Sequence, residues 1–331
     1  MKLKYKIPLI LIIFIIVLIV CGLSYLNLAF PKVSLSPKIT IKATPAMLER
    51  GEYLANHVAV CIDCHSTRDW NYYSGPLREG TLGKGGELFD ETAGVPGKVY
   101  AKNITPANLA SWSDGEIYRS ITSGVDKRGD PLFPIMPYAS YAIMDPEDVM
   151  AIIAYIRTLK PITNDAPSHS LNFPMNLIVR TIPHDATPTK RPPETDTLAY
   201  GKYLTKIAAC NECHTPQEKG DPVKGMDLAG GFEFKLPFGT IRTSNITPDN
   251  ETGIGLWTEE AFIQRFKMYD NPESRKMNVK QGEFNTIMPF LMYAGMKVGD
   301  LQAIYKYLRT VKPIHNKVDK FTPLAMKTAG M

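Results

Sequence analysis

The chain begins with a long hydrophobic run. No charged residue occurs between Lys6 and Lys32, and the centre of the run, LIIFIIVLIV, is apolar without interruption. A stretch of this length spans a bilayer as a helix. Lysines at positions 2, 4 and 6 favour a cytoplasmic N-terminus, which places the chain from about residue 32 onward on the outer face of the membrane. We therefore expect a membrane anchor at residues 1–35, with a cleaved signal peptide as the alternative.

Beyond this run, apolar residues at helical spacing mark the two ends of each half of the chain. In the first half, Tyr53, Leu54 and Val58 follow this spacing, and DPEDVMAIIAYIRTLKP at 145–161 is a stronger helical pattern. The second half has the same two patterns, the later one at 299–313. The stretches between them are rich in Gly and Pro and show few strand-like alternations. These patterns predict two all-α, loop-rich domains.

The two halves are copies of one unit. The matching segments occur in the same order, which favours a duplicated domain over chance similarity. They are GEYLANHVAVCIDCH at 51–65 with GKYLTKIAACNECH at 201–214, NITP at 103–106 and 245–248, IMPY at 135–138 with IMPF at 287–290, and AYIRTLKPI at 154–162 with KYLRTVKPI at 306–314.

The repeat sets the expected domain boundaries. We expect domain 1 at 45–162, domain 2 at 197–315 and a tail at 316–331. The segment 163–196 is rich in Pro and Thr, has no equivalent inside either unit and is typical of an extended linker. Its apolar patch, LNFPMNLIVRTI, is expected to pack across the domain surfaces.

Composition excludes one class of partner. The 331 residues are 44% hydrophobic and carry a formal charge of +5, with Lys and Arg scattered among acids. No basic stripe with interleaved aromatics is present, so nothing indicates nucleic acid.

Four of the five cysteines form two CxxC pairs, each followed by histidine. Cysteine thiols add to the vinyl groups of haem, and the adjacent histidine then lies beneath the iron, so CxxCH indicates c-type haem attachment. A redox dithiol or half a zinc site are the alternatives, but the βαβ context and the further ligand spacing that they need are missing. The sequence predicts two covalent haems c, attached through Cys61, Cys64 and His65 and through Cys210, Cys213 and His214.

Two methionines are the candidates for the remaining iron ligand. Met136 and Met288 each precede a proline in an IMP triplet, at matching positions of the repeat. Proline keeps the preceding residue extended, which gives a rigid loop able to direct a thioether at the haem. A thioether raises the reduction potential relative to a second imidazole. Core packing is the alternative for these side chains.

The remaining histidines are poorer ligand candidates. His57 lies one helical turn before Cys61, too close to reach the opposite haem face, and His169 and His184 lie in the linker. We expect these and His315 to be solvated or structural. Weaker candidates for contacts to the haem propionates are Trp112, Trp257 and Arg242, with packing as the alternative. The NITP segments are predicted turns close to the haem edge.

The motifs resemble a known family. GEYLANHVAVCIDCHS, SNITPDNETGIGLWTEEAF and NTIMPFLMY are similar to segments of the cytochrome c subunit of membrane-bound bacterial alcohol, aldehyde and gluconate dehydrogenases, over roughly residues 45 to 315. The resemblance implies tandem class I cytochrome c domains and electron relay from a periplasmic dehydrogenase towards quinone or an oxidase. It implies haem attachment at Cys61, Cys64, Cys210 and Cys213 and iron ligation by His65, Met136, His214 and Met288. Members of the family usually carry three haem domains, whereas this sequence has two CxxCH motifs.

The function expected from these features is electron transfer, not catalysis. The chain is predicted to be a single-pass protein of the bacterial cytoplasmic membrane with its haem domains on the periplasmic side. Its expected partners are a dehydrogenase, quinone, another cytochrome or an oxidase, and membrane lipid through the N-terminal helix. Two alternatives stay open: a dihaem peroxidase, in which one haem has an open distal site, and the cytochrome c subunit of a terminal oxidase.

Overall fold

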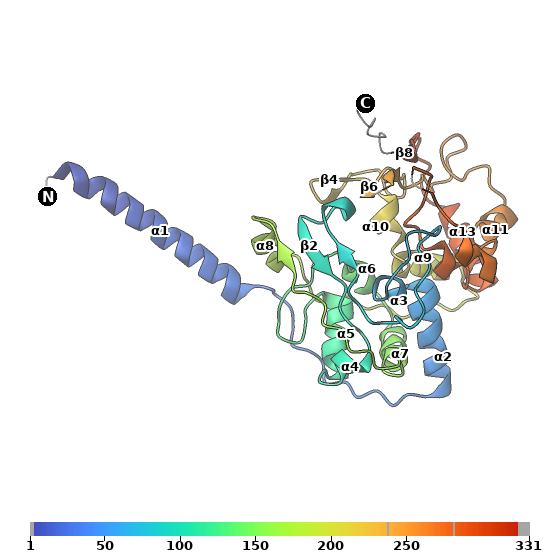
Figure 1. The fold of residues 1–331 in the computed structure, drawn as a ribbon, viewed down its shortest axis with the longest axis horizontal. Coiled ribbons are helices and arrows are strands. Elements are labelled where there is room, and N and C mark those ends of the chain that lie inside the picture. Colours follow the sequence, from blue (N-terminus) through green and yellow to red (C-terminus); the bar gives the residue numbers. More distant parts are fainter. Residues whose placement is uncertain (1–2, 237, 281, 324–331) are drawn as a thin grey trace, which may run out of the picture.

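The computed structural model describes residues 3–236, 238–280 and 282–323. Helix α1 (Leu3–Ala29) projects from the rest of the chain as a single rod (Figure 1). Its part from Pro8 to Ala29, 22 residues, is long and apolar enough to cross a membrane, and none of it is buried against the protein. The expected N-terminal helix is therefore present, and its length and composition suit an anchor and a signal sequence equally.

The first repeat begins and ends with helices at the two places where the sequence patterns predict them, and shorter helices lie in the stretch between, where the sequence predicts loops. Thr44 caps the first of these helices, and Asp145 caps the last, which begins with Pro146. The elements are α2 (Pro45–Tyr53), the π-helical turn η1 (Leu54–Val58), α3 (Cys61–Cys64), α4 (Pro106–Leu109), α5 (Asp114–Ser123), α6 (Tyr138–Tyr141) and α7 (Pro146–Ile156).

The second repeat has the same order of helices. Asp196 caps its first helix and Thr258 caps α11. The helices are α9 (Thr197–Ile207), α10 (Cys210–His214), α11 (Glu259–Lys267), α12 (Phe290–Tyr293) and α13 (Val298–Leu308), and the 3-10 turn η4 (Pro272–Lys276) follows α11.

The expectation of an all-α chain is only partly right, because short strands form three small antiparallel sheets among the described residues. The sheets have the orders β1-β2-β3, β4-β5 and β6-β7-β8. Strands of two to four residues are too short for alternating polarity to reveal them in a sequence. They are β1 (Leu88–Phe89), β2 (Gly97–Tyr100), β3 (Ser170–Leu171), β4 (Gln217–Glu218), β5 (Asp221–Pro222), β6 (Glu233–Leu236), β7 (Gly239–Arg242) and β8 (Phe321–Pro323).

The segment expected to be an extended linker is attached along the first repeat. Its strand β3 pairs with β2, and α8 (Met175–Ile178) and the 3-10 turn η3 (Val179–Thr181) follow. Farther on, the amides of Thr187 and Thr189 donate 3.0 Å hydrogen bonds to the carbonyls of Ala142 and Ile143. The apolar patch therefore packs on the protein only in part, because Val179 is buried whereas Phe173 and Ile178 are exposed. Part of the predicted tail also pairs, because β8 extends the sheet of β7; residues 324–331 lie outside the described part.

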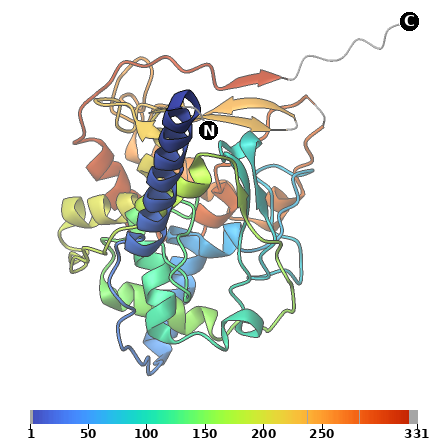
Figure 2. The same cartoon turned by 90° about the vertical axis from the view of Figure 1, so that its left-hand side faces the viewer.

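Within each repeat the first helix packs closely on the last. At the contact, a Cβ atom on Gly51 would lie 1.9 Å from the carbonyl oxygen of Ala151, and one on Gly201 would lie 1.9 Å from that of Ala303. Glycine at these matching positions lets α2 approach α7 and α9 approach α13. The apolar residues of both pairs join one hydrophobic core that runs through the two repeats. Figure 2 shows this globular part behind α1.

Candidate functional site

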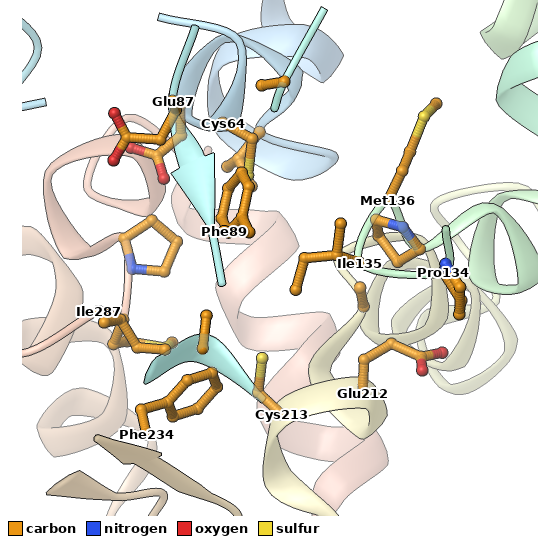
Figure 3. Close-up of a pocket in the computed structure, with 18 of the residues that line it drawn as sticks. Cys64, Glu87, Phe89, Pro134, Ile135, Met136, Glu212, Cys213, Phe234 and Ile287 are labelled. Atoms are coloured by element: carbon orange, nitrogen blue, oxygen red, sulfur yellow. The ribbon is translucent and has the colours of Figure 1, made fainter. Parts of the chain in front are cut away.

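A large cavity lies between the two repeats. It measures about 2200 Å³, and its walls come from both halves of the chain. Cys64 and Cys213 line it together with Phe89 and Ile135 (Figure 3). Every residue predicted to attach or ligate haem lines this one cavity: Cys61, Cys64, His65, Met136, Cys210, Cys213, His214 and Met288.

The backbone reverses sharply just before each CxxCH motif. Val60 and Ala209 adopt left-handed conformations, with φ of 46° and 55°. A β-branched residue is rarely found there, and such a conformation costs about 1–3 kcal/mol, so the surrounding structure must hold Val60 in place. A short helix then begins at each first cysteine, α3 at Cys61 and α10 at Cys210. Residues three apart on a helix share a face, so the two thiols of each motif lie on the same side.

Each motif histidine is held in one tautomer by a backbone carbonyl. The Nδ1 atom of His65 lies 2.6 Å from the carbonyl oxygen of Lys102, and that of His214 lies 2.7 Å from the carbonyl oxygen of Ser244. A carbonyl only accepts, so each Nδ1 carries the proton and each Nε2 keeps its lone pair. Burial lowers the pKa of both imidazoles, which are therefore neutral at pH 7. A neutral imidazole with a free Nε2 suits metal ligation.

The motif cysteines are free thiols that stay protonated at neutral pH in this fold. All four are free, and burial raises the pKa of each to about 12. A redox dithiol needs a lowered thiol pKa, so this alternative is disfavoured. Among the described residues, no group of three or more His, Cys, Asp or Glu side chains is arranged to hold a metal ion. Paired thiols and one imidazole at the wall of a large, mostly apolar cavity do fit haem c.

The two IMP triplets have the same local geometry. The amide of Tyr138 donates a 2.7 Å hydrogen bond to the carbonyl of Met136, and the amide of Phe290 does the same to Met288. The prolines between them begin α6 and α12 with nearly equal dihedral angles, φ −78° and ψ 54° in the first repeat and φ −77° and ψ 59° in the second. Both methionines thus lie at equivalent positions in the cavity wall, and iron ligation by them stays a prediction.

His169, expected to be a structural or solvated linker residue, also lines the cavity. The amide of Tyr100 donates a 3.2 Å hydrogen bond to its Nδ1 atom, so Nε2 carries the proton. Burial and the nearby Lys102 lower its pKa to about 4. A neutral ring with a protonated Nε2 is a hydrogen-bond donor and is unsuited to bind iron, which favours methionine as the remaining ligand.

His57 is structural, as expected from its place in the sequence. Its Nδ1 atom lies 2.8 Å from the carbonyl oxygen of Met292, in the other repeat. His184 is exposed, and its Nδ1 atom lies 3.0 Å from the carbonyl oxygen of Asp185. Neither residue is part of the cavity wall.

The NITP segments directly follow Lys102 and Ser244, whose carbonyls accept hydrogen bonds from the motif histidines. The side-chain amides of Asn103 and Asn245 each donate a 2.7 Å hydrogen bond, to the carbonyls of Ile162 and Ile314. Each bond fastens the loop to the chain that follows the last helix of its repeat. The weaker candidates Trp112, Trp257 and Arg242 all line the cavity, and the Arg242 guanidinium donates a 2.6 Å hydrogen bond to Glu233.

A buried ionic cluster lies beside the first motif, and no pattern in the sequence predicts it. Arg68 contacts Asp63 and Glu87, both at 3.1 Å, and its guanidinium lies 4.4 Å from the centre of the Trp70 ring. The indole N–H of Trp70 donates a 3.2 Å hydrogen bond to Glu87. These residues line the cavity.

The known proteins that resemble this chain are of one kind. No family model matches the chain. It is 27% identical to the gluconate 2-dehydrogenase cytochrome c subunit of Pantoea cypripedii, over 87% of this chain and 65% of the relative. It is 27% identical to the alcohol dehydrogenase (quinone) cytochrome c subunit of Gluconacetobacter polyoxogenes, over 86% of this chain and 60% of the relative. The fructose dehydrogenase cytochrome subunit of Gluconobacter japonicus is 28% identical, over 80% of this chain and 52% of the relative.

The chain thus spans 65% or less of the length of each of these relatives. The similarity covers both repeats, and all three relatives are named as cytochrome subunits of dehydrogenases. The resemblance seen in the motifs is therefore confirmed: this chain is a relative of the cytochrome c subunits of bacterial gluconate, alcohol and fructose dehydrogenases.

Proposed function

We propose that the chain is a membrane-anchored dihaem cytochrome c that relays electrons from a periplasmic dehydrogenase to quinone, another cytochrome or an oxidase. The observation that carries the proposal is the presence of two equivalent sets of side chains, each with two thiols, one imidazole and one thioether, in the wall of one cavity. Each set can attach one haem c and fill both of its axial positions.

The residues of the first site have distinct tasks in this proposal. Cys61 and Cys64 hold the cofactor through thioether bonds. His65 presents Nε2 because its Nδ1–H is bound to the carbonyl of Lys102. Met136 supplies a thioether that favours the reduced state. When bound, the haem supplies a one-electron couple. Cys210, Cys213, His214 and Met288 take the same tasks in the second site.

A direct contact between the two sites supports a relay. Ser140 lies on α6, the helix that follows Met136, and donates a 2.5 Å hydrogen bond to Glu212, inside the second CxxCH motif. The methionine loop of one repeat therefore contacts the attachment helix of the other. If His65 and Met136, and His214 and Met288, ligate the irons as proposed, neither haem would offer a position to a substrate, which favours a carrier over a peroxidase.

The membrane location rests on α1, whose apolar part is long enough to span a bilayer. The three lysines before it favour a periplasmic position for the two repeats. A dehydrogenase partner is proposed because the relatives are cytochrome subunits of dehydrogenases.

Carbon monoxide binding tests the ligand assignment, because it needs an open iron position. The reduced wild type should bind none rapidly. Met136→Ala should bind one carbon monoxide per chain, and Met136→Ala with Met288→Ala should bind two. Met292→Ala, which removes a methionine outside the cavity wall, should behave as the wild type. Rapid binding to the wild type would contradict the proposal.

A further inference from the structure

An exposed apolar surface lies on the segment between the two repeats. Phe173 is 79% exposed and Ile178 is 44% exposed, and both belong to the stretch 173–182 that contains α8 and η3. A phenylalanine this exposed is unusual for a protein in water, since burial of its ring is favourable. The surface is therefore a candidate contact site.

This stretch is fastened to the end of the proposed membrane span. The guanidinium of Arg180 donates a 3.2 Å hydrogen bond to the carbonyl of Phe30, the residue directly after α1. Four residues later, the amide and hydroxyl of Ser34 donate 2.7 and 2.9 Å hydrogen bonds to the two carboxylate oxygens of Asp185. Figure 1 shows α8 near the C-terminal end of α1.

The other side of the stretch is fixed to the protein. Val179 is buried, Met175 and Ile182 contribute to the cavity wall, and β3 just before the stretch is paired with β2. The stretch is thus held rigidly at the place where α1 leaves the bilayer, with an apolar side uncovered.

We propose that residues 173–182 lie in the headgroup region of the membrane that α1 spans, with Phe173 inserted among the lipids. The inference rests on the proposed anchoring by α1. The occupant is a lipid surface because the bonds to Phe30 and Ser34 keep this stretch within a few residues of the end of the span, whatever the tilt of α1. Lys32, which is exposed and lies two residues after Phe30, adds attraction to anionic headgroups. Contact at a second point orients the cavity relative to the membrane surface.

Photo-crosslinking in the full-length haem protein tests this. The probe p-benzoylphenylalanine replaces one residue at a time, and the protein is reconstituted in vesicles of phosphatidylcholine and phosphatidylglycerol, irradiated and analysed for lipid adducts by mass spectrometry. Position 173 tests the inference and position 14, within α1, tests the anchor. Leu256, which is 77% exposed in the second repeat, is the matched control. Position 176, an exposed residue of α8, replaces 173 if that variant does not fold.

Lipid adducts at positions 14 and 173, with none above background at 256, are the expected result. Adducts at 14 with none at 173 or 176 would overturn the inference and leave the anchor intact. Equal adducts at 173 and 256 would also overturn it. Absence of adducts at 14 would overturn the anchor and this inference together.

Discussion

The hydroxyl of Tyr53, on the first helix of one repeat, donates a 2.6 Å hydrogen bond to the carboxylate of Asp300, on the last helix of the other. The equivalent residues make the reciprocal bond, in which Tyr203 donates to Asp148 at 2.7 Å. Two reciprocal tyrosine–aspartate hydrogen bonds therefore join the repeats. Such a junction fixes the two sets of haem-binding residues relative to each other.

Removing either hydroxyl should weaken this junction. A hydrogen bond to a carboxylate contributes about 1.5–3 kcal/mol, so Tyr53→Phe should lower the free energy of unfolding by that amount. Tyr203→Phe should cost less, because Asp148 also pairs with two arginines. Denaturant unfolding of the purified protein measures both. Tyr305→Phe is the control, since its hydroxyl bonds a partly exposed carbonyl and should cost about 1 kcal/mol. Equal losses in Tyr53→Phe and Tyr305→Phe would argue against the junction.

The same junction should make stability depend on pH. Burial raises the pKa of Asp300 above its ordinary value of 3.8, and the bond from Tyr53 offsets this only in part. The folded chain then holds this proton more tightly than the unfolded chain, so its contribution to stability falls as pH rises through the window above 3.8. Asp300→Asn cannot titrate and still accepts the hydrogen bond. Its free energy of unfolding should fall less than that of the wild type between about pH 3 and about pH 7. Identical slopes would refute this.

The cluster at Arg68 should be a major determinant of stability near the first motif. Its side chain is 9% exposed, and Arg68→Ala would leave Asp63 and Glu87 buried without their cation. Breaking a buried ion pair costs about 3–5 kcal/mol. Arg78→Ala is the matched control, because Arg78 is 55% exposed and its 3.4 Å contact with Asp69 should contribute about 1 kcal/mol or less. Thermal unfolding compares the two, and similar losses would show that the cluster contributes little.

The sequence predicts the first and last helices of each repeat because their apolar periodicity is local, and it does not predict the helices between them. The pattern at 145–161 predicts α7, which begins at Pro146 and ends at Ile156. The strands are different, because β3 and β8 form only through pairing with β2 and β7, which are distant in the chain. Pairing of this kind depends on tertiary contacts that two or three residues do not encode.

In the candidate site, too, some features could be predicted from the sequence and others could not. The repeat reveals which residues are equivalent, so the eight haem residues could be predicted from the sequence, and all eight line one cavity. The carbonyls of Lys102 and Ser244, which fix the histidine tautomers, were not predicted, although both directly precede NITP and this shared position was the available signal. The place of His169 depends on how residues 163–196 fold back, which their composition does not show.

The central claim is that each repeat carries one covalently attached haem c. Intact mass measured under denaturing conditions tests this most directly, because only covalent haem stays on the unfolded chain. We expect the wild type to exceed the mass of its polypeptide by two haems, and the double variant Cys61→Ala, Cys64→Ala to exceed the mass of its polypeptide by one haem. A wild-type chain without two haems, or a variant that keeps both, would contradict it.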